Sequence, residues 1–346
     1  MEQQAHVERI QRCRDSLHKL DCWIDANLKA NGSWKQASRI EGYFSIVAYA
    51  NYTGRRDWAL AVLRYVQDTF PDSREVLRQG SHRDRMLGYL PAWMAVGAFD
   101  AEMFSLSNSL ADYVATFQSA ATGGFFANRE ARDTGAGPLE FDTTTMCIVA
   151  LAHTGRRGPS LRGADYLVRL LEEQPNVTEG FNTDWVEPDG LVTPGESANP
   201  VAFIRWSQPA QHYYKIGLYV MSLIHAYGLS AERRYLDAAL TVYNAAVERA
   251  THLWPNTISH KMCWAASVLH TVCGDDAYLE HAWRLAEHLL SVQQPDGTFN
   301  YPELWPTYPP EHWDMLPNAA CQFGLWIART LNALMAGDEC RERDTR

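Results

Sequence analysis

The sequence lacks the features that mark nucleic-acid-binding and membrane proteins. Its 31 Lys and Arg residues are outnumbered by 41 Asp and Glu residues, which gives a net charge of -10. Phosphate backbones are bound through basic surfaces, so we expect no nucleic-acid partner. No apolar run approaches the roughly 20 residues that a membrane-spanning helix needs, so we expect no transmembrane segment. The sequence leaves the oligomeric state open.

Cysteine patterns of disulfide-rich or zinc-binding proteins are also missing. The seven cysteines are odd in number and show no CxxC spacing, as is typical of reduced thiols in an intracellular protein. Neither HxxxH nor HExxH spacing occurs, so a zinc site is not predicted. The first 20 residues are polar and helical in pattern, without the apolar core of a signal peptide. We therefore expect a cytoplasmic location.

Alternating, β-branched runs are scarce, and almost every long segment has helical periodicity. The apolar pattern and the breakers predict about twelve helices. They are expected near 3–29, 39–54, 56–69, 82–98, 100–118, 141–154, 159–174, 209–228, 231–251, 258–273, 276–292 and 312–335.

The connections between these helices alternate in length. Short turns centred on glycine join the members of a pair, whereas longer loops rich in aromatic residues, glycine and proline join one pair to the next. This pattern predicts an all-α fold, an α/α barrel of about six helical hairpins, as a single domain over 1–346. An open α-solenoid is the competing architecture. In a closed barrel, the inner helices would direct their N-terminal ends toward one mouth.

The stretch 139–155, LEFDTTTMCIVALAHTG, places Glu140 and Asp142 directly ahead of an apolar run. Acidic and hydroxyl side chains in this position are typical of a helix N-cap. The alternative is that the two carboxylates lie at the mouth of a pocket. Helix N-termini carry partial positive charge, so several of them aimed at one point would favour an anion such as a phosphate.

Two motifs resemble terpenoid cyclases. EFDTTTMCIVAL resembles the DxDDT-type motif of class II terpene cyclases, with Asp142 at the position of the proton-donating aspartate, although Glu140 and Thr143 depart from the pattern. VQQPDGTFNYPELW (292–305) resembles the QxxDGxW repeat of the terpenoid-cyclase toroid, with weaker echoes at 30–34 and 117–126. On physical grounds we expect these repeats to be structural connections between hairpins.

The chain also resembles the atypical fungal humulene synthases of tropolone sesquiterpenoid biosynthesis. That resemblance implies farnesyl diphosphate as substrate, magnesium as cofactor and an essential lysine. Lys261 starts an apolar helix and is the first candidate for the lysine, and Lys215 is the second. Hard oxygen ligands suit Mg²⁺, so we predict that Glu140 and Asp142 bind it. The predicted substrate contacts are Arg83, Lys215, His260, Trp264 and Trp326.

The resulting functional prediction is a terpene cyclase that ionises a linear prenyl diphosphate, with Asp142 and Lys261 as catalytic residues. Protonation-initiated (class II) cyclisation, with Asp142 as general acid, is an alternative. A six-hairpin glycoside hydrolase or sugar epimerase is a second alternative, in which Asp142 would pair with Asp184, Glu303 or Asp314. A non-catalytic helical scaffold is a third.

The wall of the cavity distinguishes these functions. A terpene site requires apolar side chains above the acids, so Met146, Trp264, Phe323 and Trp326 would then face the same cavity as Asp142. A sugar site requires hydrogen-bonding groups throughout.

Overall fold

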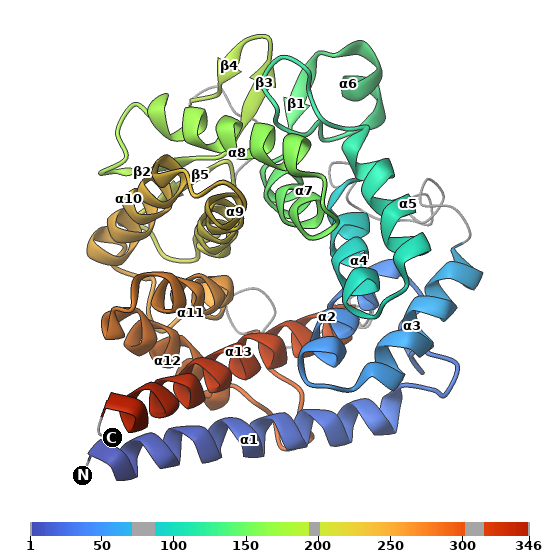
Figure 1. The fold of residues 1–346 in the computed structure, drawn as a ribbon, viewed down its shortest axis with the longest axis vertical. Helices are drawn as coiled ribbons and strands as arrows, with labels where there is room; N and C mark the ends of the chain where they lie inside the picture. The colour runs from blue at the N-terminus through green and yellow to red at the C-terminus, as the bar shows by residue number, and fades with distance from the viewer. Residues whose placement is uncertain (1, 71–86, 194–200, 302–314, 345–346) are drawn as a thin grey trace.

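The computed structural model describes residues 2–70, 87–193, 201–301 and 315–344, and these are mainly helical (Figure 1). The helices are α1 Glu2–Asn27, α2 Phe44–Tyr52, α3 Arg56–Thr69, α4 Tyr89–Asp100, α5 Phe104–Ala115, α6 Arg129–Thr134, α7 Phe141–His153, α8 Arg157–Glu172, α9 Tyr214–Ser230, α10 Arg233–Arg249, α11 His260–Cys273, α12 Asp276–Ser291 and α13 Met315–Asp344.

The helices form two concentric rings. Each of the inner helices α2, α4, α7, α9, α11 and α13 contacts the next, and α13 contacts α2, so that the ring closes. Helices α3, α5, α8, α10 and α12 follow the inner helices along the chain and lie outside them (Figure 1). The last hairpin joins the two ends of the chain, because α1 packs against α13. The prediction of an α/α barrel of about six hairpins is confirmed, and ring closure rules out the open solenoid.

The distribution of apolar residues explains which helices lie inside. The first eleven residues of α7, from Phe141 to Leu151, are all buried, as expected for a helix surrounded by others. The outer helix α12 buries one stripe that includes Leu279, Trp283 and Leu289 and exposes its other face. An apolar stripe with this spacing is the pattern of a helix that covers a core from one side.

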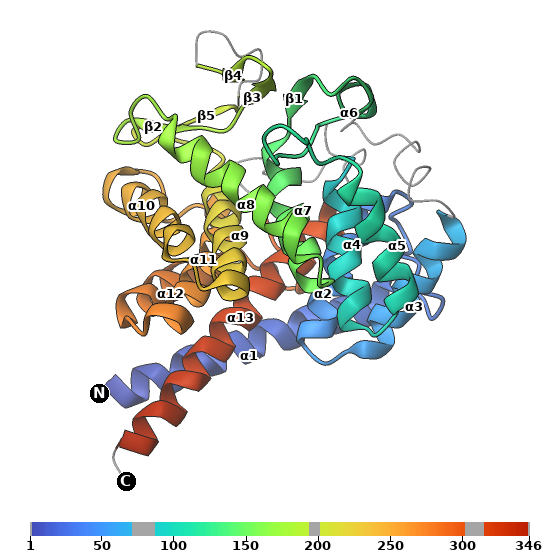
Figure 2. The same cartoon turned by 45° about the horizontal axis from the view of Figure 1, so that its top comes forward.

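The loops at one end of the barrel contain elements that the sequence did not predict. Strands β1 (Gly137–Leu139), β3 (Trp185–Glu187) and β4 (Gly190–Leu191) form an antiparallel sheet, and β2 (Gly180–Asn182) pairs with β5 (Phe203–Arg205). They lie together at the top of the view in Figure 2. Strands of two or three residues are too short to show a period-two pattern. Helix α9 also begins at Tyr214, later than the predicted 209.

The QxxDGxW-like stretches at 117–126 and 292–305 connect neighbouring outer helices. After α5, the Gln118 side chain donates hydrogen bonds to the carbonyls of Gly123 (2.9 Å) and Pro159 (2.8 Å), the second of which lies on α8. After α12, Gln293 donates in the same way to Gly297 (3.1 Å) and to Ser16 (3.0 Å) of α1. The prediction that these repeats are structural connections is confirmed.

Glycine is required in these loops for two reasons. Gly123 and Gly297 have φ of +90° and +97°, which L-residues with a side chain rarely adopt. A Cβ at either position would also lie 2.3 Å from a backbone carbonyl oxygen of the adjacent outer helix. Each loop therefore contacts the next hairpin through its backbone.

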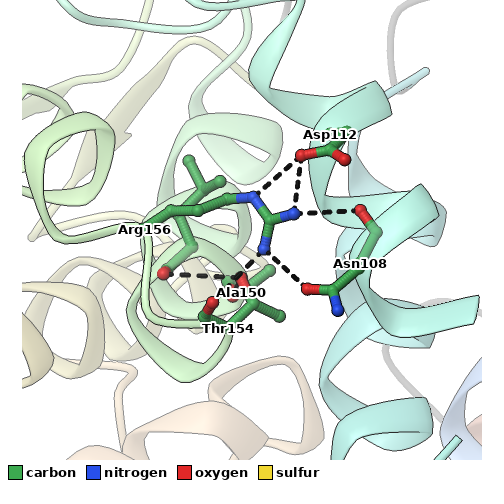
Figure 3. Close-up of polar contacts among 6 residues, drawn as sticks. Asn108, Asp112, Ala150, Thr154 and Arg156 are labelled. Atoms are coloured by element: carbon green, nitrogen blue, oxygen red, sulfur yellow. Dashed lines mark hydrogen bonds and ion pairs between the residues drawn. The ribbon is translucent and has the colours of Figure 1, made fainter. Parts of the chain in front are cut away.

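A polar contact ties successive hairpins at the opposite end of the barrel. Arg156, in the turn between α7 and α8, donates to Asp112 Oδ1 from Nε (3.0 Å) and Nη2 (2.6 Å) (Figure 3). Its Nη1 donates to Asn108 Oδ1 at 3.2 Å. Both partners belong to α5, the outer helix of the preceding hairpin.

Within the described ranges, no helix combines the length and the apolar character needed to cross a membrane.

Gly217 controls how closely two inner helices approach. A Cβ at Gly217 of α9 would lie 2.4 Å from the backbone carbon and oxygen of Lys261 on α11. We predict that Gly217→Ala lowers the free energy of unfolding by about 1–3 kcal/mol, because the helices must separate. Urea denaturation measures the change.

Gly228→Ala, in the same helix, is the matched control. Apart from the adjoining backbone of α9, no atom of the described residues lies within 4 Å of a Cβ built at Gly228, so this variant should gain up to about 1 kcal/mol from helix propensity. Equal stability of the two variants would contradict the close-approach argument.

Candidate active site

A cavity of about 110 Å³ lies where the inner helices begin. Its walls include the first residues of α2, α4, α9, α11 and α13 and the second residue of α7. The lining residues are Phe44, Tyr89, Asp142, His212, Tyr214, His260, Lys261, Tyr301, Met315, Asn318, Ala319, Gln322 and Phe323. Most of these side chains can form hydrogen bonds.

Asp142 supplies the carboxylate of this cavity. The side chain is buried, and the Tyr214 hydroxyl donates a hydrogen bond to its Oδ2 at 2.9 Å. Its Oδ1 is buried without a hydrogen-bond partner among the described residues. Unsatisfied buried polar atoms are costly and rare, and a catalytic role or a bound water or ion accounts for them where they occur.

Lys261 supplies the cation. It is buried, and its Nζ donates a hydrogen bond to the Tyr89 hydroxyl at 3.1 Å. The same Nζ lies 4.4 Å from the centre of the Tyr214 ring, within cation–π range. Carboxylate and ammonium groups therefore line one cavity, with Tyr214 in contact with both.

Two hydrogen-bond contacts fix the His260 ring. Its Nδ1 lies 2.9 Å from the Thr257 carbonyl oxygen, and its Nε2 lies 3.1 Å from Oε1 of Gln322. Burial, together with the nearby charge of Lys261, lowers the pKa of His260 to about 3, and the two hydrogen bonds act in the opposite direction. A group with so low a pKa is a weak proton acceptor at neutral pH.

Glu140 is the N-cap of α7. Its carboxylate accepts a hydrogen bond from the backbone N–H of Thr143, so the predicted capping role is confirmed. Burial, reinforced by the charge of Asp142, raises the pKa of Glu140 to about 7. The charge of Lys215 and the Thr143 hydrogen bond act in the opposite direction. Glu140 is therefore partly protonated near neutral pH.

The structure brings together some of the predicted site residues and separates others. Asp142, His260 and Lys261 line the cavity. Neither Glu140 nor Lys215 is among the lining residues. The Lys215 Nζ donates instead to Thr183 Oγ1 at 3.1 Å and to the Val201 carbonyl at 3.3 Å. Arg83 lies outside the described residues.

Trp264 and Trp326 do not line the cavity either. Their rings stack at 4.8 Å, and each lies near Trp93, at 6.0 and 6.3 Å respectively. Trp93 in turn contacts Phe44 of the cavity wall, at 5.8 Å between ring centres. These tryptophans form a buried layer behind the cavity. Met146 is also buried and absent from the cavity wall, and Phe323 is the only member of the proposed apolar set among the lining residues.

Sequence analysis missed the tyrosines of the site and Gln322. Tyr89 and Tyr214 are the first residues of α4 and α9, and Gln322 lies one turn after Asn318 on α13. The signal that could have found the two tyrosines is position, because the first turns of the inner helices face the same mouth. Gln322 lies about two turns into α13, beyond the reach of that signal.

Magnesium binding by Glu140 and Asp142 stays a prediction. Glu140 and Asp142 lie two residues apart at the start of α7, and both could offer oxygen ligands. Among the described residues, no group of three or more His, Cys, Asp or Glu side chains is arranged to hold a metal ion.

No protein-family model matches the chain, and no curated protein matches it. Solved structures match the fold along most of its length. D-mannose isomerase is 11% identical, with 90% of this chain and 96% of that chain covered and a TM-score of 0.63. An unsaturated glucuronyl hydrolase specific for heparin is 10% identical, with 94% and 97% covered and a TM-score of 0.64.

A third match is an inactive variant of an α-1,6-mannanase from Salegentibacter, in complex with α-1,6-mannotriose. It is 10% identical, with 92% of this chain and 98% of that chain covered and a TM-score of 0.61. In that variant two consecutive aspartates are changed to asparagine. Identities this low show the fold alone.

The resemblance to terpenoid cyclases, including the humulene synthases, is therefore wrong. The matching structures described above are two glycoside-cleaving enzymes and a sugar isomerase. The cavity wall agrees with this correction, since hydrogen-bonding groups surround Asp142 and the predicted apolar lining is largely elsewhere. The prediction of a terpene cyclase acting on farnesyl diphosphate or another isoprenoid diphosphate is overturned, for ionisation and for protonation alike.

The raised pKa of Glu140 predicts a pH dependence of stability. Between the usual glutamate pKa, about 4.3, and about 7, the folded protein keeps a proton that the unfolded chain has lost. The contribution of Glu140 to stability is thus fully present below about pH 4.3 and declines as pH rises toward 7. Glu140→Gln should remove this decline.

Urea denaturation of the wild-type protein and of Glu140→Gln at several pH values in this window measures the difference. Profiles that remain parallel would show that Glu140 titrates normally.

Proposed function

We propose that the protein is a glycoside hydrolase. The observation that carries the proposal is the set of hydrogen-bonding side chains that line the cavity with Asp142, because Tyr89, Tyr214, His260, Lys261 and Gln322 can bind sugar hydroxyls. Phe44 and Tyr301 offer ring faces for the apolar face of a pyranose. The α-1,6-mannanase and the unsaturated glucuronyl hydrolase that share the fold cleave sugars, which supports this assignment.

Two carboxylates in different environments can divide the chemistry of glycoside cleavage. Glu140, with its pKa raised to about 7, is the candidate acid because it stands two residues from Asp142, although it caps α7 and is not among the residues that line the cavity. Asp142, held by Tyr214, is the candidate base or nucleophile. Of the other acids considered as partners of Asp142, Asp184 does not line the cavity, and Glu303 and Asp314 lie outside the described residues.

The inactive mannanase variant bears on the proposed role of the carboxylates in glycoside cleavage. In that protein, the loss of two consecutive aspartates accompanies loss of activity. Here the acids are separated by Phe141, which is buried against Phe181 and Tyr219.

Sugar isomerisation is the second candidate, and Asp142 and Lys261 favour it. Isomerisation moves a proton between neighbouring carbons and places negative charge on oxygen. The Asp142 carboxylate can accept the proton, and the buried ammonium of Lys261 can stabilise the oxyanion. D-mannose isomerase shares the fold.

One NMR assay separates the two candidates. The purified chain is incubated with α-1,6-mannotriose, an unsaturated heparin disaccharide and free mannose, and the anomeric region is followed. New reducing ends from the first two substrates would establish hydrolysis, whereas ketose from mannose would establish isomerisation. Absence of both would overturn the carbohydrate proposal for these substrates.

Asp142→Asn should reduce hydrolysis by about 100-fold or more, as expected for loss of a base or nucleophile. Glu140→Gln should reduce cleavage of natural glycosides by a similar factor, and cleavage of an aryl glycoside much less, because a good leaving group needs little protonation. Asp184→Asn is the matched control and should retain activity. Equal loss for both substrate types in Glu140→Gln would contradict its role as acid.

Chelation tests the magnesium prediction independently. If the two carboxylates act as acid and base, overnight dialysis against EDTA should leave the hydrolysis rate unchanged. A loss that is restored by added Mg²⁺ would assign Glu140 and Asp142 to metal binding instead.

A further inference from the structure

We infer that Tyr214 is a positioning residue that fixes the Asp142 carboxylate and couples it to Lys261. The inference rests on the proposed function, because it assigns Asp142 a role in the reaction. Tyr214 belongs to α9, whereas Asp142 and Lys261 belong to α7 and α11, so one side chain spans three adjacent inner helices.

The contacts of Tyr214 place it at the centre of the polar side chains in the cavity. Its hydroxyl donates to Asp142 Oδ2 at 2.9 Å, and the Lys261 Nζ lies 4.4 Å from its ring centre. Its ring stacks on His260, with 5.9 Å between centres and an interplanar angle of 25°, and lies 5.4 Å from the ring of His212. All four partners also line the cavity.

These contacts act on the carboxylate in two ways. The Asp142 Oδ1 has no hydrogen-bond partner among the described residues, so the tyrosine hydroxyl fixes the orientation of the carboxylate through its other oxygen. A cation against the ring withdraws electron density from the phenol, and this makes its O–H a stronger donor to the carboxylate. Lys261 therefore acts on Asp142 through Tyr214.

Tyr214→Phe tests the inference because it retains the ring and removes the donor. We expect kcat on the hydrolysed glycoside to fall about 10- to 100-fold, the factor that corresponds to a hydrogen bond to a charged group. KM should change by less than about 3-fold, since the ring and the cavity wall stay in place. A rise in KM with kcat unchanged would overturn the positioning role.

Tyr213→Phe is the matched control. Tyr213 is the neighbouring residue and is buried, but its hydroxyl donates to the Gln208 carbonyl at 3.1 Å and does not contact Asp142. This variant loses a buried hydrogen bond of similar kind, so its stability should fall while kcat stays close to the wild-type value. An equal fall of kcat in both variants would show that Tyr214 is merely structural.

Lys261→Met completes a double-mutant cycle. If Lys261 acts through Tyr214, the double variant should lose less kcat than the product of the two single losses. Multiplicative losses would contradict the coupling.

A spectroscopic readout separates failure of this inference from failure of the proposed function. With ¹³C-labelled aspartate, the carboxyl resonance of Asp142 is identified by its absence in Asp142→Asn. At fixed pH this resonance should shift in Tyr214→Phe and stay in place in Tyr213→Phe. No shift would overturn the inference even if the enzyme cleaves sugars, and a shift would support it even if the tested sugars are not substrates.

Discussion

Burial of the inner helices on every side confines their polar chemistry to their ends. Along α7, the apolar run from Met146 to Leu151 is fully enclosed, whereas Glu140 and Asp142 stand in the first turn. The same division occurs in α11, where His260 and Lys261 begin the helix. Because the inner ring is closed, these first turns meet at one mouth, and the Asp142 carboxylate comes together with His260 and Lys261 from a segment far away in sequence.

The closed ring depends in turn on the contacts between hairpins. The loops containing Gly123 and Gly297 place backbone directly against the next outer helix, and Gln118 and Gln293 tie each loop to both sides of the junction. Within the inner ring, Gly217 allows α9 to touch the backbone of α11 at Lys261. That contact helps to set the distance between Tyr214 and Lys261, and thus links packing to the geometry of the site.

The fold could be predicted because its signals are local and repeated. Helical periodicity and glycine turns such as that at Gly155 mark the helices, and the alternation of short and long connections groups them into hairpins. The rule that polar residues at helix starts face the mouth identified Asp142, His260 and Lys261. The same rule would have found Tyr89 and Tyr214, had tyrosine been counted among the polar residues.

The chemistry could not be predicted in the same way, because side-chain direction is not local. Trp264 lies about one turn inside the start of α11 and Trp326 about three turns inside the start of α13, and both side chains turn into the core and stack on one another. We expected these two tryptophans to face an apolar cavity beside Asp142. The motif that contains Glu140 and Asp142 was therefore compared with that of terpenoid cyclases. The structure gives Asp142 a polar setting instead, and carbohydrate-active enzymes share the fold.

The central claim is that a sugar binds in the cavity against Asp142. A crystal structure of Asp142→Asn soaked with α-1,6-mannotriose or a heparin-derived disaccharide would test it most directly. The account predicts a pyranose ring within hydrogen-bonding distance of residue 142 and Lys261, in contact with Tyr214. A sugar bound elsewhere on the barrel, with this cavity filled only by water, would contradict it.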